Sequence, residues 1–230
     1  MTAGITLAID GPAGAGKSTV AKIVARSLGY RLVDTGAIYR AVALLAQRRG
    51  IAWDDDAGLG PIVSDLDIDF AFVGEVNHVH VHGEDVSEAI RTPEISRGAS
   101  EVSARPVVRQ GLLGLQRKLA GAGGVVLEGR DIGTVVCPQA EVKIFLDADP
   151  VERARRRYEE LRAKGLQEPF EQVKDQLMER DSRDTGRELA PLRAADDALR
   201  LDSTRMSLAE VVARVVATVH RAEREHDAQG

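Results

Sequence analysis

Short apolar runs alternate along the chain with segments in which apolar residues recur every three or four positions. The runs predict buried strands at residues 5–10, 30–34, 125–128, 143–147 and, from a less regular run, 198–202. The helical spacing predicts helices at residues 17–27, 39–47, 107–120, 151–164, 171–182 and 208–225. Ser207 and Glu210 form a capping box at the start of the last helix. This alternation predicts an α/β fold, a parallel sheet with helices on both faces.

Residues 66–82 break the alternation. Segments 67–73 and 76–82 alternate apolar and polar residues and meet at Gly74, which predicts a β-hairpin inserted in the α/β core. Three histidines are expected on one face of its second strand: His78, His80 and His82. They could converge on a metal ion, or form a solvated face while the valines between them pack inward. The lack of a nearby cysteine favours the solvated face.

Composition restricts the class of protein. At 230 residues, with 43% hydrophobic and 29% charged residues, the chain can build one substantial core. The net charge of −5 disfavours non-specific binding to nucleic-acid polymers or membranes, and 3% aromatic residues disfavour base-stacking platforms. Cys137 is the single cysteine, expected to be a small buried residue, and it suits a reducing cytosol. Without a secretory pattern or an apolar stretch of membrane-spanning length, we expect a cytoplasmic monomer.

A glycine-rich segment lies between the first predicted strand and helix and fits the phosphate-loop pattern. Its residues are Gly11, Pro12, Ala13, Gly14, Ala15, Gly16, Lys17, Ser18 and Thr19. In this context, backbone N–H groups and the helix N-terminus hold a polyphosphate. Lys17 is expected to reach the β- and γ-phosphates, and the Ser18 hydroxyl to ligate Mg²⁺. The motif predicts a nucleoside triphosphate and leaves the phosphate acceptor open.

Arginines recur beside predicted strand ends, where open α/β sheets bind ligands. They occur in residues 34–40, 128–131 and 180–187, and Arg109 lies near the start of a helix. Each one alone is typical of a surface charge, but the set supplies the positive charge that phosphoryl transfer requires.

Residues 153–157, Arg-Ala-Arg-Arg-Arg, are the densest basic cluster. They lie near a helix start, where the dipole disfavours cations. We interpret them as a mobile lid over phosphates; a solvated charged face is the alternative.

The motifs, in order and nearly end to end, resemble those of bacterial cytidylate kinases. The matching segments are residues 11–19, 34–40, 128–134, 143–148, 180–184 and 201–204. Gly-Ala-Ile-Tyr-Arg and Gly-Arg-Asp-Ile-Gly-Thr are more specific than the phosphate loop. The resemblance implies a P-loop NTPase-type sheet with a small β-containing insert for the nucleoside monophosphate and a short helical lid. The implied boundaries are about 66–105 for the insert and 150–166 for the lid, with a core of 1–65, 106–149 and 167–230.

The resemblance also implies ATP-dependent phosphorylation of CMP and dCMP with Mg²⁺. The implied ATP-binding residues are the phosphate loop with Arg153, Arg157 and Ser203. The implied CMP-binding residues are Thr35, Arg40, Ser100, Arg109, Arg130, Asp131, Asp184 and Arg187. The implied catalytic residues are Lys17, Arg130, Arg180 and Arg187. Ser18 is expected to ligate the metal directly, and Glu128, which ends an apolar strand, through water.

The implied base contacts agree with the chemistry of cytosine. Cytosine presents a donor at N4 and an acceptor at N3, and uracil reverses both. An Arg109 donor paired with an Asp131 acceptor would therefore select cytosine, with the Ser100 hydroxyl assisting. Asp184, as the ribose contact, would tolerate loss of the 2′-hydroxyl and so admit dCMP.

Two positions depart from many members of the family, which have Asp at Glu128 and Ser at Thr35. Both replacements keep the functional group and alter only its reach. An adenylate or uridylate kinase is the alternative within the same class, and the Gly-Arg-Asp segment and the long hairpin favour a cytidylate kinase. A GTPase-like switch is the alternative from another class. It would require an Asn-Lys-x-Asp segment, which the sequence lacks.

Overall fold

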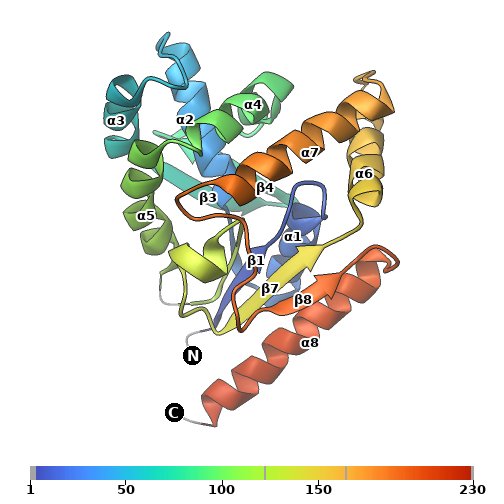
Figure 1. The fold of residues 1–230 in the computed structure, drawn as a ribbon. Coiled ribbons are helices and arrows are strands. Elements are labelled where there is room, and N and C mark those ends of the chain that lie inside the picture. Colours follow the sequence, from blue (N-terminus) through green and yellow to red (C-terminus); the bar gives the residue numbers. More distant parts are fainter. Residues whose placement is uncertain (1–3, 122, 164, 229–230) are drawn as a thin grey trace.

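A five-stranded parallel sheet lies at the centre of the computed structural model, which describes residues 4–121, 123–163 and 165–228 (Figure 1). Its strands, in spatial order, are β2 (Arg31–Asp34), β6 (Val125–Gly129), β1 (Thr6–Asp10), β7 (Val142–Asp147) and β8 (Leu199–Asp202). After β1 the chain forms β2 at one edge of the sheet, and later it adds β7 and β8 on the other side of β1. The turn after β1 therefore lies where the winding reverses, the position at which such sheets bind ligands. The fifth strand expected at 198–202 is confirmed as β8.

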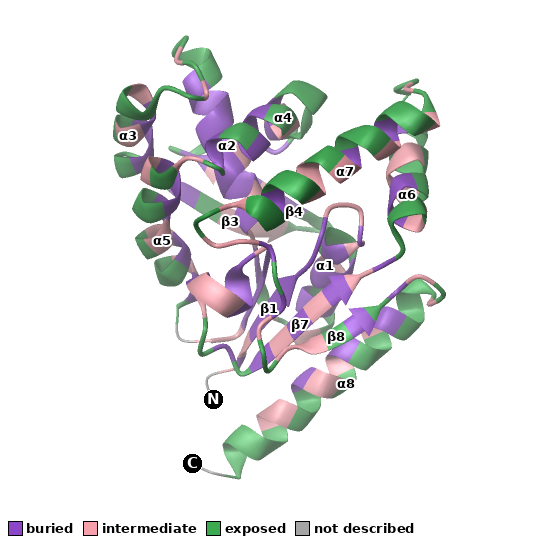
Figure 2. Cartoon of the chain, viewed as in Figure 1, coloured by how far each residue is buried: buried purple, intermediate pink, exposed green. Residues whose placement is uncertain are grey.

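Helices cover both faces of this sheet, as predicted. Helices α1 (Lys17–Leu28) and α8 (Leu208–Asp227) pack on one face through a cluster that includes Val24 and Val215. Helices α2 (Thr35–Arg48) and α5 (Pro106–Ala120) pack on the other face. Figure 2 shows the burial concentrated in the central strands and α2. Strands β1 and β6 are apolar runs because both of their faces are covered.

The predicted hairpin is present as β3 (Ile68–Val73) and β4 (Val76–Val81), and a short third strand, β5 (Glu84–Asp85), completes an antiparallel sheet. Two helices beside it were not predicted: α3 (Asp56–Ser64) and α4 (Pro93–Val102), the latter after a 3₁₀ turn, Ala89–Arg91. Their start signals are nevertheless in the sequence. Asp55 accepts from the N–H groups of Ala57 and Gly58, and Thr92 caps α4 ahead of a proline at its first position.

The expectation that three histidines share a strand face is wrong for His82. Strand β4 ends one residue earlier, and His82 is exposed with φ 50°, so its side chain leaves the alternation. Nδ1 of His78 lies 2.6 Å from Oδ2 of Asp85, and the centroids of the His78 and His80 rings lie 6.3 Å apart. The intervening valines are buried, as predicted. Nowhere among the described residues do three or more histidine, cysteine or acidic side chains gather as a metal site.

Helix α2 begins at Thr35 instead of at residue 39, because Asp34 caps it by accepting from the Ala37 N–H at 2.9 Å. Helices α6 (Pro150–Ala163) and α7 (Phe170–Gly186) form a hairpin, and α7 runs above the central sheet between α4 and α6 (Figure 1). The segment after β6 folds as a single π-helical turn, Ile132–Val136. Cys137 follows it, half-buried against the core, and burial raises the pKa of its thiol.

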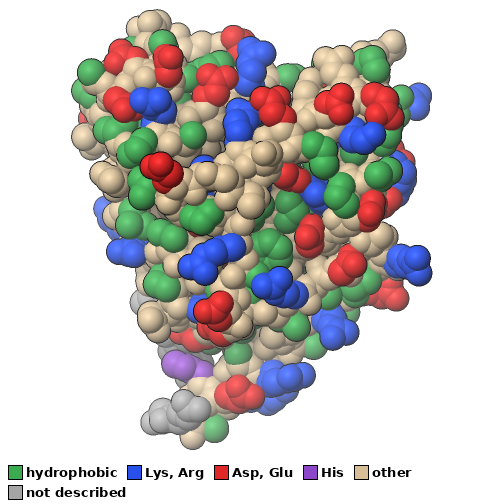
Figure 3. All heavy atoms as spheres, in the orientation of Figure 1, with side chains coloured by type: hydrophobic (Ala, Val, Ile, Leu, Met, Phe, Trp, Pro, Cys, Tyr) green, Lys and Arg blue, Asp and Glu red, His purple; other side chains and the backbone are tan. Residues whose placement is uncertain are grey.

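Charge on the face drawn in Figure 3 is mixed, with basic and acidic side chains interspersed. In the part of the chain that the structure describes, no helix combines the length and apolarity needed to cross a bilayer.

The capping box of α8 yields a prediction of stability. The Ser207 hydroxyl accepts from the Glu210 N–H, and the Glu210 carboxylate accepts from the Ser207 N–H at 2.8 Å. We expect Ser207→Ala to lower the free energy of unfolding by about 1 kcal/mol, measured by urea denaturation. Thr218→Ala, at a half-buried position in the middle of the same helix, is the control, with an expected change below about 0.5 kcal/mol. Equal effects of the two substitutions would contradict the capping role.

Candidate functional site

A cavity of about 1140 Å³ opens at the carboxyl edge of the central sheet. Its wall is formed by the phosphate loop, the ends of β2 and β6, the inner sides of α4 and α5, and the α6–α7 hairpin. The topology therefore brings together segments that are far apart in the sequence. All the predicted CMP-binding residues line this cavity: Thr35, Arg40, Ser100, Arg109, Arg130, Asp131, Asp184 and Arg187.

Glycines are required in the phosphate loop at two positions. A Cβ atom on Gly11 would lie 1.9 Å from the Leu146 carbonyl oxygen, so only glycine lets the loop leave β1 against β7. Gly16 precedes α1 with φ 90°, a left-handed conformation that L side chains rarely adopt. Residues 13–19 line the cavity, so the N-terminus of α1 faces into it.

Lys17 is buried, and its Nζ donates to the Pro12 carbonyl at 2.7 Å. Burial lowers the pKa of Lys17, and the nearby Arg130 lowers it further, while Glu128 opposes both. The Lys17 side chain therefore folds back over the loop. A phosphate bound beside its ammonium group would stabilise the positive charge that burial disfavours.

Ser18 and Glu128 lie together at the end of β6. The Ser18 hydroxyl donates to Glu128 Oε2 at 2.9 Å, and the Thr35 hydroxyl donates to the Glu128 carbonyl at 2.7 Å. Burial raises the pKa of the Glu128 carboxyl, and Asp34 adds to the shift. A hydroxyl beside a carboxylate is a pair of hard oxygen donors, so the residues fit Mg²⁺ at this position.

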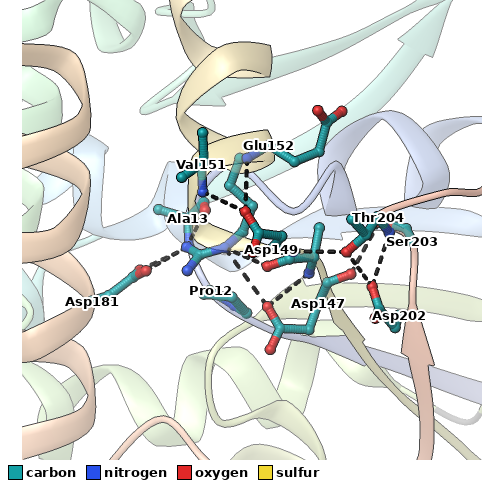
Figure 4. A network of polar contacts seen from close by, with 12 residues as sticks. Pro12, Ala13, Asp147, Asp149, Val151, Glu152, Asp181, Asp202, Ser203 and Thr204 are labelled. Carbon is teal, nitrogen blue, oxygen red and sulfur yellow. Dashed lines mark hydrogen bonds and ion pairs between the residues drawn. The ribbon is translucent and has the colours of Figure 1, made fainter. Parts of the chain in front are cut away.

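Arg153 does not line the cavity, contrary to the expectation of a lid arginine facing ATP. It is buried, donates to the carbonyls of Ala13 and Ala148, and pairs with Asp181 of α7. Asp181 in turn accepts from the Ala13 N–H at 3.2 Å, as the close-up in Figure 4 shows from the loop side. This arginine therefore fastens the phosphate loop to the α6–α7 hairpin.

The neighbouring lid arginines do line the cavity. Arg156 donates to the Ser203 hydroxyl at 3.0 Å and to the Ser203 carbonyl at 2.8 Å. Arg157 also lines the cavity and pairs with Glu160 at 2.8 Å. Successive side chains of a helix point about 100° apart. Arg153 therefore faces the phosphate loop, while Arg156 and Arg157 face the cavity. Ser203 is buried and is held by the Asp147 carbonyl.

Three arginines surround the buried Asp184 carboxylate. Arg130 Nε donates to its Oδ2 at 2.9 Å, and Arg187 Nη1 lies 3.7 Å from its Oδ1. Burial, together with the nearby positive charge of Arg130, lowers the pKa of Arg180 to about 10. Nε of Arg180, and Nε and Nη2 of Arg187, are buried without a hydrogen-bond partner. One carboxylate thus faces more positive charge than it can neutralise.

A separate ion pair in the cavity lining joins Arg109 of α5 to Asp131, which follows β6. Arg109 pairs with Asp131 through Nη2 and Oδ2, and its Nη1 donates to the Ser103 carbonyl at 3.1 Å. The guanidinium carbon lies 5.6 Å from the centroid of the Tyr39 ring, which holds it in place. The Ser100 hydroxyl is buried nearby in the same lining without a partner.

Arg40 points into the cavity from α2. Its Nη2 donates to Asp34 Oδ2 at 2.6 Å, and its buried Nε has no partner. Asp34 therefore both caps the helix and orients this arginine.

Three residues with roles at the site were not predicted individually: Asp10, Asp34 and Arg156. Asp34 and Arg156 belong to segments that were singled out, but the sequence alone does not show which member faces which partner. Asp10 carries the clearest signal, an acidic residue that ends a buried apolar strand directly before the phosphate loop. A carboxylate in such a place needs hydrogen-bond donors, and the structure provides two.

Comparison with known proteins agrees with this geometry. The family model described as cytidylate kinase matches residues 7–221. A cytidylate kinase from Geobacter sp. is 54% identical over 227 residues, covering 99% of this chain and 96% of its own. One from Geobacter sulfurreducens is 53% identical, covering 96% and 95%. A crystal structure of an uncharacterized protein from Eubacterium ventriosum superposes with TM-score 0.50 at 12% identity, over 94% of this chain and 98% of that one, a likeness in fold alone.

The unpartnered N–H groups of Arg187 yield a prediction. A buried cation that lacks partners destabilises the protein when no ligand is bound. We expect Arg187→Met to raise the free energy of unfolding without ligand by about 1 kcal/mol, measured by urea denaturation. Arg183, which is exposed on α7 four residues before Arg187, is the control, and Arg183→Met should change stability by less than about 0.5 kcal/mol. A loss of stability on replacing Arg187 would show that its pairing with Asp184 outweighs its burial.

Proposed function

The chain belongs to the cytidylate kinase family, it phosphorylates CMP and dCMP, and we propose that it does so by direct transfer of the γ-phosphoryl group of MgATP. No covalent enzyme intermediate is involved. One observation carries the proposal: buried, unpartnered donors of Arg40, Arg180 and Arg187 line the same cavity as the phosphate loop. Buried donors of this kind need acceptors. Two phosphate groups that lie between these arginines and the phosphate loop would supply them.

The donor occupies the phosphate-loop end of the cavity in this proposal. Residues 13–19 hold its phosphates, and Lys17 turns from the Pro12 carbonyl to the β- and γ-phosphates. Ser18 would hold Mg²⁺ directly and Glu128 would hold it through water, and the ion would supply positive charge against the charge that develops on the phosphates. Arg157 and Ser203 lie on the ATP side, to which the structure adds Arg156 as a candidate. Arg153 acts through the loop that it fastens.

The acceptor occupies the opposite end. Arg109 and Asp131 read the N3 and N4 edge of cytosine, and the Ser100 hydroxyl gains its missing partner there. Thr35, held at the end of β6, lies beside the acceptor. The Asp184 carboxylate gives up part of its contact with Arg130 and Arg187 and accepts hydrogen bonds from the ribose hydroxyls instead. Asp184 would accept from the 3′-hydroxyl in both sugars, which is why dCMP is also a substrate.

Arg40, Arg130, Arg180 and Arg187 hold the acceptor phosphate and the transferring phosphoryl group. Their work is positioning and charge stabilisation, because phosphoryl transfer requires little covalent chemistry from the protein. The insert at residues 66–105 and the lid at residues 150–166 close over both substrates and exclude water, which limits ATP hydrolysis. A monomer acting in the cytoplasm completes the proposal.

Removing the Lys17 ammonium tests the donor side. We expect Lys17→Ala to lower kcat for CMP phosphorylation roughly 100-fold or more, because a preorganised charge at the transferring phosphate is lost. ADP release in a coupled assay measures it, with circular dichroism to check the fold. Lys22→Ala, farther along α1 and outside the cavity lining, is the matched control and should retain kcat. Retained turnover in Lys17→Ala would refute the role.

A screen of the four ribonucleoside monophosphates with MgATP tests the acceptor side. We expect the highest kcat/KM with CMP, and Asp131→Ala should lower the CMP-to-UMP ratio roughly 5- to 150-fold, the discrimination of one good bidentate contact. The KM for ATP should change little. Highest activity on AMP or GMP would overturn the assignment of substrate, and an unchanged ratio would overturn the role of Asp131 alone.

A further inference from the structure

Asp10 is a buried acidic residue that the proposed chemistry does not use. It ends β1, directly before Gly11, and is 4% exposed. Its two oxygens accept from consecutive backbone N–H groups: Oδ1 from Ile132 at 2.8 Å and Oδ2 from Gly133 at 2.7 Å. Burial raises the pKa of Asp10 to about 6, and these two hydrogen bonds oppose the shift. Both contacts use the carboxylate as an acceptor.

The two N–H groups belong to the first residues of the π-helical turn Ile132–Val136, and Asp131 occupies the N-cap position of that turn. An aspartate at an N-cap normally accepts from the N–H groups of the residues that follow it. Here the Asp131 side chain makes no such bond. Instead, Oδ2 of Asp131 pairs with Arg109, and Asp131 lines the cavity.

Asp10 therefore caps the turn from another strand, in place of the residue that would ordinarily cap it. The register explains how it can: Asp10 lies opposite Gly129 in the parallel pairing of β1 with β6, so its side chain is level with the segment that leaves β6. The turn packs closely at this point, since a Cβ on Gly133 would lie 3.4 Å from Asp10 Oδ2 and 3.2 Å from Lys143 Cδ.

We propose that Asp10 is a positioning residue for acceptor specificity: by capping the turn after β6 it keeps the Asp131 carboxylate turned toward Arg109 and the base of the acceptor nucleotide. The inference rests on the base-reading role proposed for Asp131. Without the Asp10 carboxylate, the turn's N–H groups lack an acceptor, and the nearest replacement is Asp131 itself. A bond of that kind would draw Asp131 away from the base. The strand that carries the phosphate loop would thus also set which base is accepted.

The test is Asp10→Asn, which keeps the size of the side chain and replaces one acceptor oxygen by a donor. We expect the CMP-to-UMP ratio of kcat/KM to fall roughly tenfold, the effect of losing one hydrogen bond to a charged acceptor. The KM for CMP should rise, and the KM for MgATP should change less than about twofold, since the loop's own contacts remain. Asp55→Asn is the matched control, because Asp55 also accepts two backbone N–H groups at a helix start. It should leave the ratio unchanged.

Combining Asp10→Asn with Asp131→Ala identifies the route of the effect. If Asp10 acts through Asp131, adding Asp10→Asn to Asp131→Ala lowers the ratio no further. An unchanged ratio in Asp10→Asn, an equal rise of both KM values, or a further fall in the double variant would each overturn the inference. An unchanged ratio in Asp131→Ala would instead overturn the base-reading role on which it rests. Should Asp10→Asn fail to fold, Asp10→Glu, which keeps the charge and shifts the carboxylate by one methylene group, is judged by the same ratio.

Discussion

The Asp184 carboxylate organises the positive charge of the site. It holds Arg130 through a hydrogen bond, lies near Arg187, and stabilises the charge on Arg180, yet it supplies only one negative charge. Burial lowers the pKa of Arg180 and Arg187 because their charge is not fully compensated. A protein with a net charge of −5 thus contains a strongly basic interior. The missing negative charge is what the phosphate groups of two nucleotides would provide.

The order of the central sheet determines how these charges meet the donor. Strands β1 and β6 are neighbours, with Ile9 opposite Glu128 and Asp10 opposite Gly129. The phosphate loop follows β1 at the same level at which Arg130 and Asp131 follow β6, although about half the chain separates them in sequence. The lid arginines lie on α6, the helix that follows β7. A two-substrate site is therefore a consequence of parallel strands that end at one edge.

Much of this could be predicted from sequence because local patterns specify it. The phosphate loop, β1 and α1 follow from glycine spacing and apolar periodicity, and the hairpin from its alternation. Helix α3 was missed because Gly60 and Pro61 weaken its helical signal, although packing of its apolar residues against α5 stabilises it. The role of Arg153 was missed for a different reason. Which side of α6 faces the loop depends on the packing of α7, and no local pattern records it.

Two carboxylates connect the phosphate loop and the strand before it to other segments of the cavity wall. Asp181 accepts from the Ala13 N–H and is adjacent to Arg180, which lines the cavity. Asp10, at the other end of the loop, caps the turn that presents Asp131. The loop is therefore connected through hydrogen bonds to the segment that carries Arg180, and the strand before it to the segment that carries Asp131. Substitution at Arg109 or Asp131 would remove a proposed contact to the base and leave these hydrogen bonds in place, whereas substitution at Asp10 would leave the contact residues unchanged and alter what positions them.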